Sequence, residues 1–210
     1  MKMKDKKGEE ELARKLRKER LAAEKKKRRE KPPLEREEPA LQEKPTILIV
    51  CEGENTEPSY FTKFKLSSAT IHAIGKGCNT LSLIKSAMEY IKDNPYDQVW
   101  CVFDKDDFSA QDFNQAIQLS IAQNFGVAYS NQSFEYWLIL HFEDHQGGAM
   151  DRKEYEKTIN QYIGPLSCHF DGTGSKLITT EFFALLSGKD AQTERMRIDL
   201  AIDRAKRNYA

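Results

Sequence analysis

VWCVFDKDD, residues 99–107, is the stretch around which the rest of the chain is organised, because here an apolar run ends abruptly in three carboxylates. These are Asp104, Asp106 and Asp107. A buried strand with acidic residues at its carboxyl end is a common way for an α/β protein to build a site at the edge of its sheet. A second apolar run, TILIVCEGENTE at residues 46–57, also stops at a carboxylate, Glu52. Together the two runs predict one acidic pocket.

Strand and helix patterns alternate from residue 46 to residue 142. The run at 47–51 is β-branched and of strand length, whereas the apolar residues of 80–93 recur at the three- and four-residue steps of a helix. Such alternation predicts an α/β fold, in which a parallel sheet is flanked by helices and all strand carboxyl ends share one edge. The predicted strands are 47–51, 69–74, 99–103 and 126–129. Three helices are predicted to start near Thr56, at residue 80 and near Ser109, and a fourth spans residues 134–142.

Beyond residue 143 the pattern is only helical, with helices predicted at 151–163, 177–186 and 191–208. This part has the character of a helical cap on the sheet. The predicted organisation is therefore a charged tail at 1–44, an α/β domain at 45–142 and a helical extension at 143–210 packed on it.

The tail and the body carry opposite charge. Residues 1–44 hold 17 Lys or Arg against 11 Asp or Glu, which leaves 16 basic and 22 acidic residues for 45–210. The tail cannot bury a core, so it is either disordered or a solvated helix over residues 9–31 that ends at Pro32. A solvated charge run and an arm that contacts nucleic acid or a protein partner are both consistent with this composition.

The cysteines and the hydropathy indicate the compartment. Four cysteines show no CxxC pair, and Cys51 and Cys101 fall inside predicted strands, where a free thiol acts as a small buried hydrophobe. No apolar run approaches the roughly 18 residues of a membrane span, and no leader pattern opens the chain. We therefore expect a cytoplasmic protein with no membrane partner.

The predicted strand ends carry the chemistry. If the first and third strands are neighbours, Glu52 faces Asp104 and Asp106 across the switch-point crevice. Mutually repelling carboxylates are costly there unless a divalent cation neutralises them, and oxygen ligands of this kind suit Mg²⁺ or Mn²⁺. Such a cation activates water and stabilises charge on a phosphoryl group. The alternative is that these acids only crowd a solvated turn.

The same residues resemble a known signature. CEGENTE and FDKDD are similar to the TOPRIM motifs, in which Glu-Gly follows the first strand and Asp-x-Asp the third. More closely, EGENTEPSYF, VWCVFDKDD and SNQSFEYWLILHF, in this order, resemble the RloB family of phage-defence proteins. The resemblance covers about residues 45–142 well, and it implies a TOPRIM-like, Rossmannoid sheet.

The resemblance also implies roles. Glu52 would act as general acid or base, Asp104 and Asp106 would bind the metal, and Gly53 would let the backbone approach a phosphate. Because no domain supplies a tyrosine nucleophile, attack by water is expected, which makes the chain a metal-dependent nuclease of DNA or RNA in phage defence (abortive infection). The alternative is a non-catalytic nucleic-acid-binding or regulatory subunit that works with an AAA-type ATPase partner.

Further candidates accompany this core. Glu57 either binds a second metal or only stabilises the amino end of its helix through the helix dipole. Asp107 is either a further metal ligand or an ordinary turn residue. Asn131 and Glu135 are expected just past the fourth strand, Asn131 as a contact to nucleic acid and Glu135 as a further ligand. Lys176 follows a DGTGS loop that is either a phosphate cradle or an ordinary flexible loop.

Two histidines, His141 and His145, stand four residues apart. The zincin pattern requires Glu directly after the first histidine, and Phe142 stands there. Both are therefore interpreted as packed or surface histidines.

Overall fold

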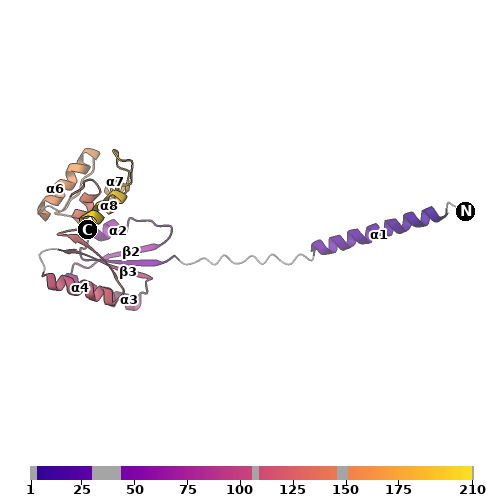
Figure 1. Cartoon of the computed structure of the whole chain (residues 1–210), viewed down its shortest axis with the longest axis horizontal. Coiled ribbons are helices and arrows are strands. Elements are labelled where there is room, and N and C mark those ends of the chain that lie inside the picture. The colour runs from indigo at the N-terminus through magenta and orange to yellow at the C-terminus, as the bar shows by residue number, and fades with distance from the viewer. Residues whose placement is uncertain (1–3, 30–43, 106–108, 146–150, 210) are drawn as a thin grey trace. The chain divides into compact units, whose positions relative to one another are not determined.

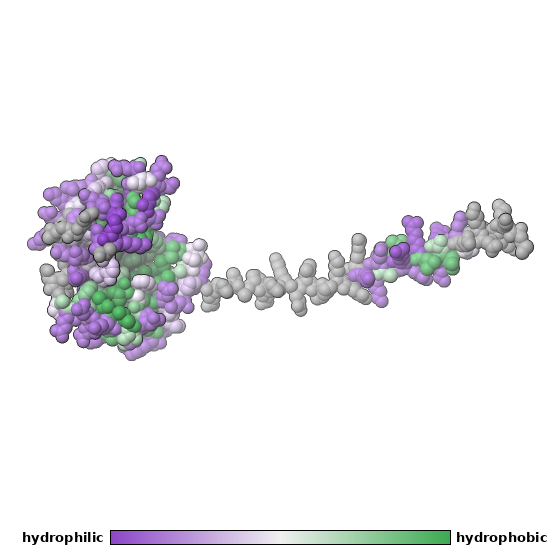
Figure 2. Space-filling view, in the orientation of Figure 1, coloured by the Kyte–Doolittle hydropathy of each residue, from purple (hydrophilic) through white to green (hydrophobic). Residues whose placement is uncertain are grey.

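The computed structural model describes residues 4–29, 44–105, 109–145 and 151–209. The chain divides into two units, Met1–Glu43 and Lys44–Ala210. In the first unit, helix α1 (Lys4–Arg29) is hydrophilic along most of its surface, interrupted by hydrophobic residues (Figure 2). Leu12, Leu16 and Leu21 are exposed on it. No helix among the described residues is both long and apolar enough to cross a membrane.

The second unit is built on a four-stranded sheet, and the α/β prediction is confirmed. All neighbouring strands pair in parallel, in the order β2-β1-β3-β4. The strands are β1 (Thr46–Cys51), β2 (Thr70–Gly75), β3 (Gln98–Lys105) and β4 (Gly126–Asn131). Because β1 lies between β2 and β3, the ends of the first and third strands are neighbours.

The two faces of the sheet follow from alternation along β1. Leu48 and Val50 face helices α3 (Thr80–Asp93) and α4 (Ala110–Ala122), which lie below the strands in Figure 1. Successive side chains of a strand point to opposite faces, so Ile49 and Cys51 face the other helices. Both α3 and α4 begin at a side-chain cap. Asn79 Oδ1 accepts from the backbone N–H of Ser82 at 3.0 Å, and Ser109 Oγ accepts from that of Asp112 at 3.2 Å.

The second face carries α2 and all of the C-terminal helices. One hydrophobic core joins Ile49 and Val102 of the sheet to Leu138, Ile159 and Phe182. The residues after 143 therefore pack on the sheet itself. The helices on this face are α2 (Thr56–Phe61), α5 (Glu135–Leu140), α6 (Arg152–Ile163), α7 (Thr180–Ser187) and α8 (Arg197–Tyr209), with a 3₁₀ turn at Gly164–Leu166.

Two strand ends differ from the prediction. Strand β3 runs on through Asp104 and Lys105, because β4 continues beside it and pairs Asp104 with Ser130 and Lys105 with Asn131. Asn131 is accordingly the last residue of β4 and does not lie past it. Polar residues at a strand end have the composition of a turn, and only the neighbouring strand shows that the ladder continues.

The last two helices start later than predicted. Thr179 caps α7, so that helix begins at Thr180. Before α8, Asp190 Oδ2 accepts hydrogen bonds from the backbone N–H groups of Gln192 (3.2 Å) and Thr193 (2.9 Å). This turn, with an antiparallel bridge between Lys189 and Met196, replaces the predicted first turns of the helix.

Candidate functional site

The structure places Glu52 and Asp104 side by side at the carboxyl edge of the sheet. The backbone N–H of Glu52 donates to Val102 O at 2.9 Å, which continues the β1–β3 ladder by one residue. Glu52 Oε2 then accepts from the backbone N–H of Asp104 at 3.3 Å and from Thr80 Oγ1 at 3.5 Å. These two donors orient the Glu52 carboxyl group toward the third strand.

A cavity of about 290 Å³ opens beside this pair. It is lined by the start of α3 from Asn79 to Ser82, by Asp104 and Lys105, and by Ala110, Asp112 and Phe113 of α4. The first N–H groups of a helix lack intrahelical partners and carry partial positive charge, so a helix amino end favours anions. Two such ends beside a carboxylate pair suit a phosphate group and a cation together.

Two other predicted ligands, Asp106 and Asp107, lie outside the described residues. Among the residues that are described, no three His, Cys, Asp or Glu side chains form a group that could hold a metal ion. Asp104 lines the cavity together with Asp112. Of the predicted ligands, the two that the structure describes beside it are Glu52 and Asp104, joined by the bond from the Asp104 backbone N–H to Glu52 Oε2. Both contribute carboxylate oxygens, the donor type that Mg²⁺ and Mn²⁺ prefer.

Glu57 lies in a second group of charged residues. Its side chain is buried, at 4% exposure, and its Oε1 accepts a hydrogen bond from the backbone N–H of Gly53 at 3.1 Å. Burial raises the pKa of Glu57, and the negative charge of Glu135 raises it further, while the Gly53 N–H and the Lys176 ammonium act in the opposite direction. The structure therefore brings Glu57, Glu135 and Lys176 within electrostatic reach of one another.

Glycine at position 53 is what admits the Glu57 side chain. The carboxyl group of Glu57 fills the space that a Cβ at position 53 would need, and its atoms are the three nearest to that position. The resemblance implies that Gly53 lets the backbone approach a phosphate. The contacts give Gly53 a second role, because its N–H donates to Glu57 and its missing side chain leaves room for the Glu57 carboxyl group.

The DGTGS loop is organised around its own aspartate. Asp171 accepts hydrogen bonds from the backbone N–H groups of Gly174 and Ser175, both at 2.8 Å, and these bonds hold its pKa below the usual range. Because both N–H groups already have an acceptor within the loop, they do not form a phosphate cradle. The segment that follows docks on α2, where Ile178 N–H donates to Ser59 Oγ at 2.9 Å, which places Lys176 near Glu57.

Asn131 is not brought to the Glu52–Asp104 pair. It is exposed at the end of β4 and lines a different, larger cavity. Lys105, its partner in the ladder, lines both cavities. Lys105 and Thr80 are site residues that sequence reasoning missed. Two signals in the sequence could have indicated them. Lys105 alternates with two aspartates in Asp-Lys-Asp, and Thr80 directly follows Asn79, the predicted cap of the helix.

The histidines and cysteines have structural surroundings. His141 is buried, its Nδ1 lies 2.9 Å from Trp137 O and its Nε2 3.3 Å from the Tyr60 hydroxyl. Burial lowers the pKa of His141 to about 4. Cys51 and Cys101 are buried free thiols, and burial raises the pKa of both. The interpretation of His141 as a packed histidine and of these cysteines as small core residues is confirmed.

Comparison with known proteins identifies the family. The family model described as RloB-like protein matches residues 47–210, and the chain belongs to this family. A search of curated proteins found no match, and a search of solved structures found none either.

Proposed function

We propose that this chain is a metal-dependent nuclease of the TOPRIM type that hydrolyses the phosphodiester bonds of nucleic acid. The observation that carries the proposal is the contact between Glu52 and Asp104, whose backbone N–H lies 3.3 Å from Glu52 Oε2, beside a cavity between two helix amino ends. Carboxylates, a helix dipole and an open cavity are together the parts that hydrolysis of a phosphodiester needs.

The proposed cofactor is Mg²⁺ or Mn²⁺. The oxygen donors of Glu52 and Asp104 fit such a cation, and Asp106, two residues further along the same stretch, is the proposed additional ligand. When bound, the cation would stabilise negative charge on the phosphoryl group and lower the pKa of a coordinated water.

The residues of the chain contribute the remaining steps. The amino ends of α3 and α4 would bind the phosphate through backbone N–H groups. Glu52, oriented by the Asp104 N–H and the Thr80 hydroxyl, would take a proton from the attacking water at its carboxylate oxygen. Glu57 has a raised pKa and so holds a proton more readily than an ordinary glutamate, but it is buried and lines neither cavity. The leaving oxygen would therefore take its proton from solvent water.

The biological setting is proposed from the resemblance to phage-defence proteins. We place the nuclease in defence against phage, with an AAA-type ATPase as its partner. The basic tail supports nucleic acid as the substrate, because α1 alone carries 13 Lys or Arg against 6 Asp or Glu.

The decisive experiment compares two aspartate variants of the full-length protein. Labelled DNA and RNA are incubated with Mg²⁺ or Mn²⁺, with and without EDTA. Asp104→Asn keeps the size of the side chain and removes its charge, so we expect cleavage to fall at least about 100-fold. Asp93→Asn is the matched control, because Asp93 is exposed at the opposite end of α3 from the cavity.

The outcomes separate the alternatives. Metal-dependent cleavage that Asp104→Asn abolishes and Asp93→Asn preserves, with equal melting temperatures, supports the proposal. Equal cleavage by both variants refutes the assignment of the site. Binding of nucleic acid without cleavage under any of these conditions refutes the nuclease and favours the regulatory subunit.

A further inference from the structure

The larger cavity, of about 810 Å³, lies against the same end of the sheet. Strands β3 and β4 contribute Val102, Ala128 and Ser130 to it, and helices α2, α5 and α8 supply the other walls. Its volume falls within the range of sites that bind small molecules or single nucleotides, about 300–1,000 Å³. None of the roles assigned above, other than the position of Asn131, uses this cavity.

Aromatic rings dominate the lining. Phe61, Phe64, Tyr129, Phe134, Trp137 and Tyr209 all border the cavity. Tyr129 is 41% exposed and packs edge-on against Phe113, with ring centroids 5.1 Å apart, and Tyr209 is 80% exposed. Phe134 is buried, so the rings that solvent reaches are those of the other lining aromatics. Flat, partly exposed rings around an open space are the surface on which nucleobases stack, whatever their sequence.

Polar groups occur at one end of the cavity. Lys105, Ser130 and Asn131 line it where β3 and β4 end, and Lys105 also lines the smaller cavity that holds Asp104. Because Lys105 directly follows Asp104 and borders both cavities, a phosphate bound beside Asp104 would lie next to a cavity that suits a base. The amide of Asn131 offers both a donor and an acceptor, the pair that a base edge presents in return.

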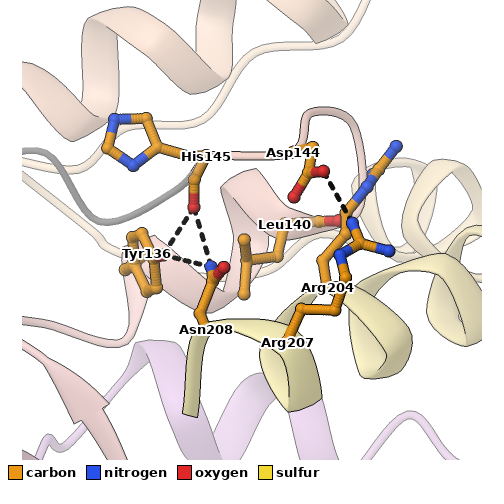
Figure 3. A network of polar contacts seen from close by, with 7 residues as sticks. All are labelled: Tyr136, Leu140, Asp144, His145, Arg204, Arg207 and Asn208. Atoms are coloured by element: carbon orange, nitrogen blue, oxygen red, sulfur yellow. Dashed lines mark hydrogen bonds and ion pairs between the residues drawn. The ribbon is translucent and has the colours of Figure 1, made fainter. Parts of the chain in front are cut away.

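The wall formed by α8 is held in place by a polar network (Figure 3). Arg204 Nη1 donates to Leu140 O at 2.7 Å, and Asn208 Nδ2 donates to the Tyr136 hydroxyl and to His145 O, both at 2.8 Å. The Tyr136 hydroxyl also donates to His145 O at 2.8 Å. These bonds tie the C-terminal helix to α5 and the segment after it, so the cavity is formed before any ligand enters.

We propose that the larger cavity binds an unpaired nucleobase of the substrate, which makes single-stranded nucleic acid the substrate class. This inference deepens the proposed function and rests on it for the position of the phosphate. A base in a duplex is stacked on both sides and paired, so it enters such a cavity only after leaving the helix. An unpaired base enters without that cost.

The test measures binding in EDTA, so that no cleavage is required. Fluorescence anisotropy of a labelled ten-nucleotide single strand is compared with that of an abasic strand of the same length. Both carry the same phosphates, so the basic tail contributes equally to each. For the wild-type full-length protein we expect the strand with bases to bind at least about tenfold more tightly.

Two variants change the cavity and one serves as control. Ile202→Glu places a charge among the aromatic rings, and Ala205→Phe fills space in the α8 wall without adding charge. We expect each to bring the affinity ratio between the two strands close to one. Ile121→Glu makes the same change at an exposed site on α4 that lines neither of the two cavities, and it should keep the wild-type ratio.

The results distinguish this inference from the proposed nuclease. Equal ratios for Ile202→Glu, Ala205→Phe and Ile121→Glu, with all three melting as the wild type does, overturn the nucleobase site. Cleavage in Mg²⁺ without any preference for bases also overturns it and leaves the nuclease standing. A preference for bases that both cavity variants lose supports the site, even where no cleavage is found.

Discussion

Replacing Gly53 by alanine tests how the charged edge of the sheet is assembled. The added Cβ would collide with the carboxyl group of Glu57, whose atoms are the three nearest to that position. Glu57 is buried, with 4% of its surface exposed, so its side chain has little room to retreat. The collision would also break the hydrogen bond from Gly53 N–H to Glu57 Oε1, now 3.1 Å long.

The size of the effect follows from these contacts. Overpacking a well-filled site costs about 1–3 kcal/mol, and a buried acceptor that loses its donor costs about 1–3 kcal/mol. Alanine opposes this by about 0.4–1 kcal/mol, because it has fewer conformations than glycine in the unfolded chain. Taking the centres of these ranges, we expect Gly53→Ala to lower the free energy of unfolding by about 3 kcal/mol, or the melting temperature of this unit by about 6–12 °C.

A double-mutant cycle isolates the cause. In a Glu57→Ala background the collision is absent, so Gly53→Ala should be neutral or slightly stabilising. The coupling between the two sites should therefore be about 3 kcal/mol. Gly164→Ala is a matched control, because nothing lies within 4 Å of a Cβ there and the backbone is helical. Thermal unfolding by circular dichroism gives the stability of the wild type, the three variants of the cycle and the control.

One result would refute the coupling between Gly53 and Glu57. If Gly53→Ala lowers the melting temperature equally with and without the Glu57 side chain, the two residues are not coupled. The glycine would then be required for another reason, and the contact that places Glu57 at this edge would have no energetic weight.

Three further predictions concern pH and the tail. Burial lowers the pKa of His141 from 6.5 to about 4, so wild type should lose about 3 kcal/mol of stability as pH falls from 6.5 to 4, and urea unfolding of His141→Gln should show a much smaller loss. Glu57 has the opposite sign, because its raised pKa means that the folded state loses stability as pH rises above 4.5; Glu57→Gln should flatten that decline, and equal pH slopes would contradict it. Removing residues 1–43 should weaken binding of nucleic acid and reduce its salt dependence, measured by anisotropy over a salt series, whereas an unchanged slope would show that the tail makes no phosphate contacts.

The sequence predicts the sheet well because its signal is local. Strand β1 alternates between two buried faces, and the apolar residues of α3 recur at helical steps, so both elements fall within a residue of their expected bounds. The adjacency of β1 and β3 follows from the usual order of doubly wound sheets and is confirmed by their register. The predicted start of the last helix is wrong, because the turn at Asp190 depends on hydrogen bonds that the hydrophobic periodicity does not show.

The candidate site was harder to predict, because its contacts are tertiary. Nothing in the local sequence shows that Glu57 is buried or that Glu135 and Lys176 lie within its electrostatic reach, since burial comes from α5 and the C-terminal segment packing against α2. The same holds for Thr80, which meets Glu52 only because α3 starts at the carboxyl edge of β1. Sequence alone names the carboxylates, and packing decides which of them share surroundings.

The two groups of carboxylates lie on different sides of β1, and this bears on how they could cooperate. The charge of Glu52 raises the pKa of Cys78, which lies just before α3. The charge of Glu57 instead raises the pKa of Cys51, whose side chain belongs to the core on the opposite face of the sheet. Gly53 joins them, since it follows Glu52 directly and donates its N–H to Glu57. A shift of the backbone at Gly53 would therefore move both carboxyl groups together. If one group binds phosphate and the other holds a proton, the two functions are coupled through this single peptide, and a substitution at position 53 would impair both at once.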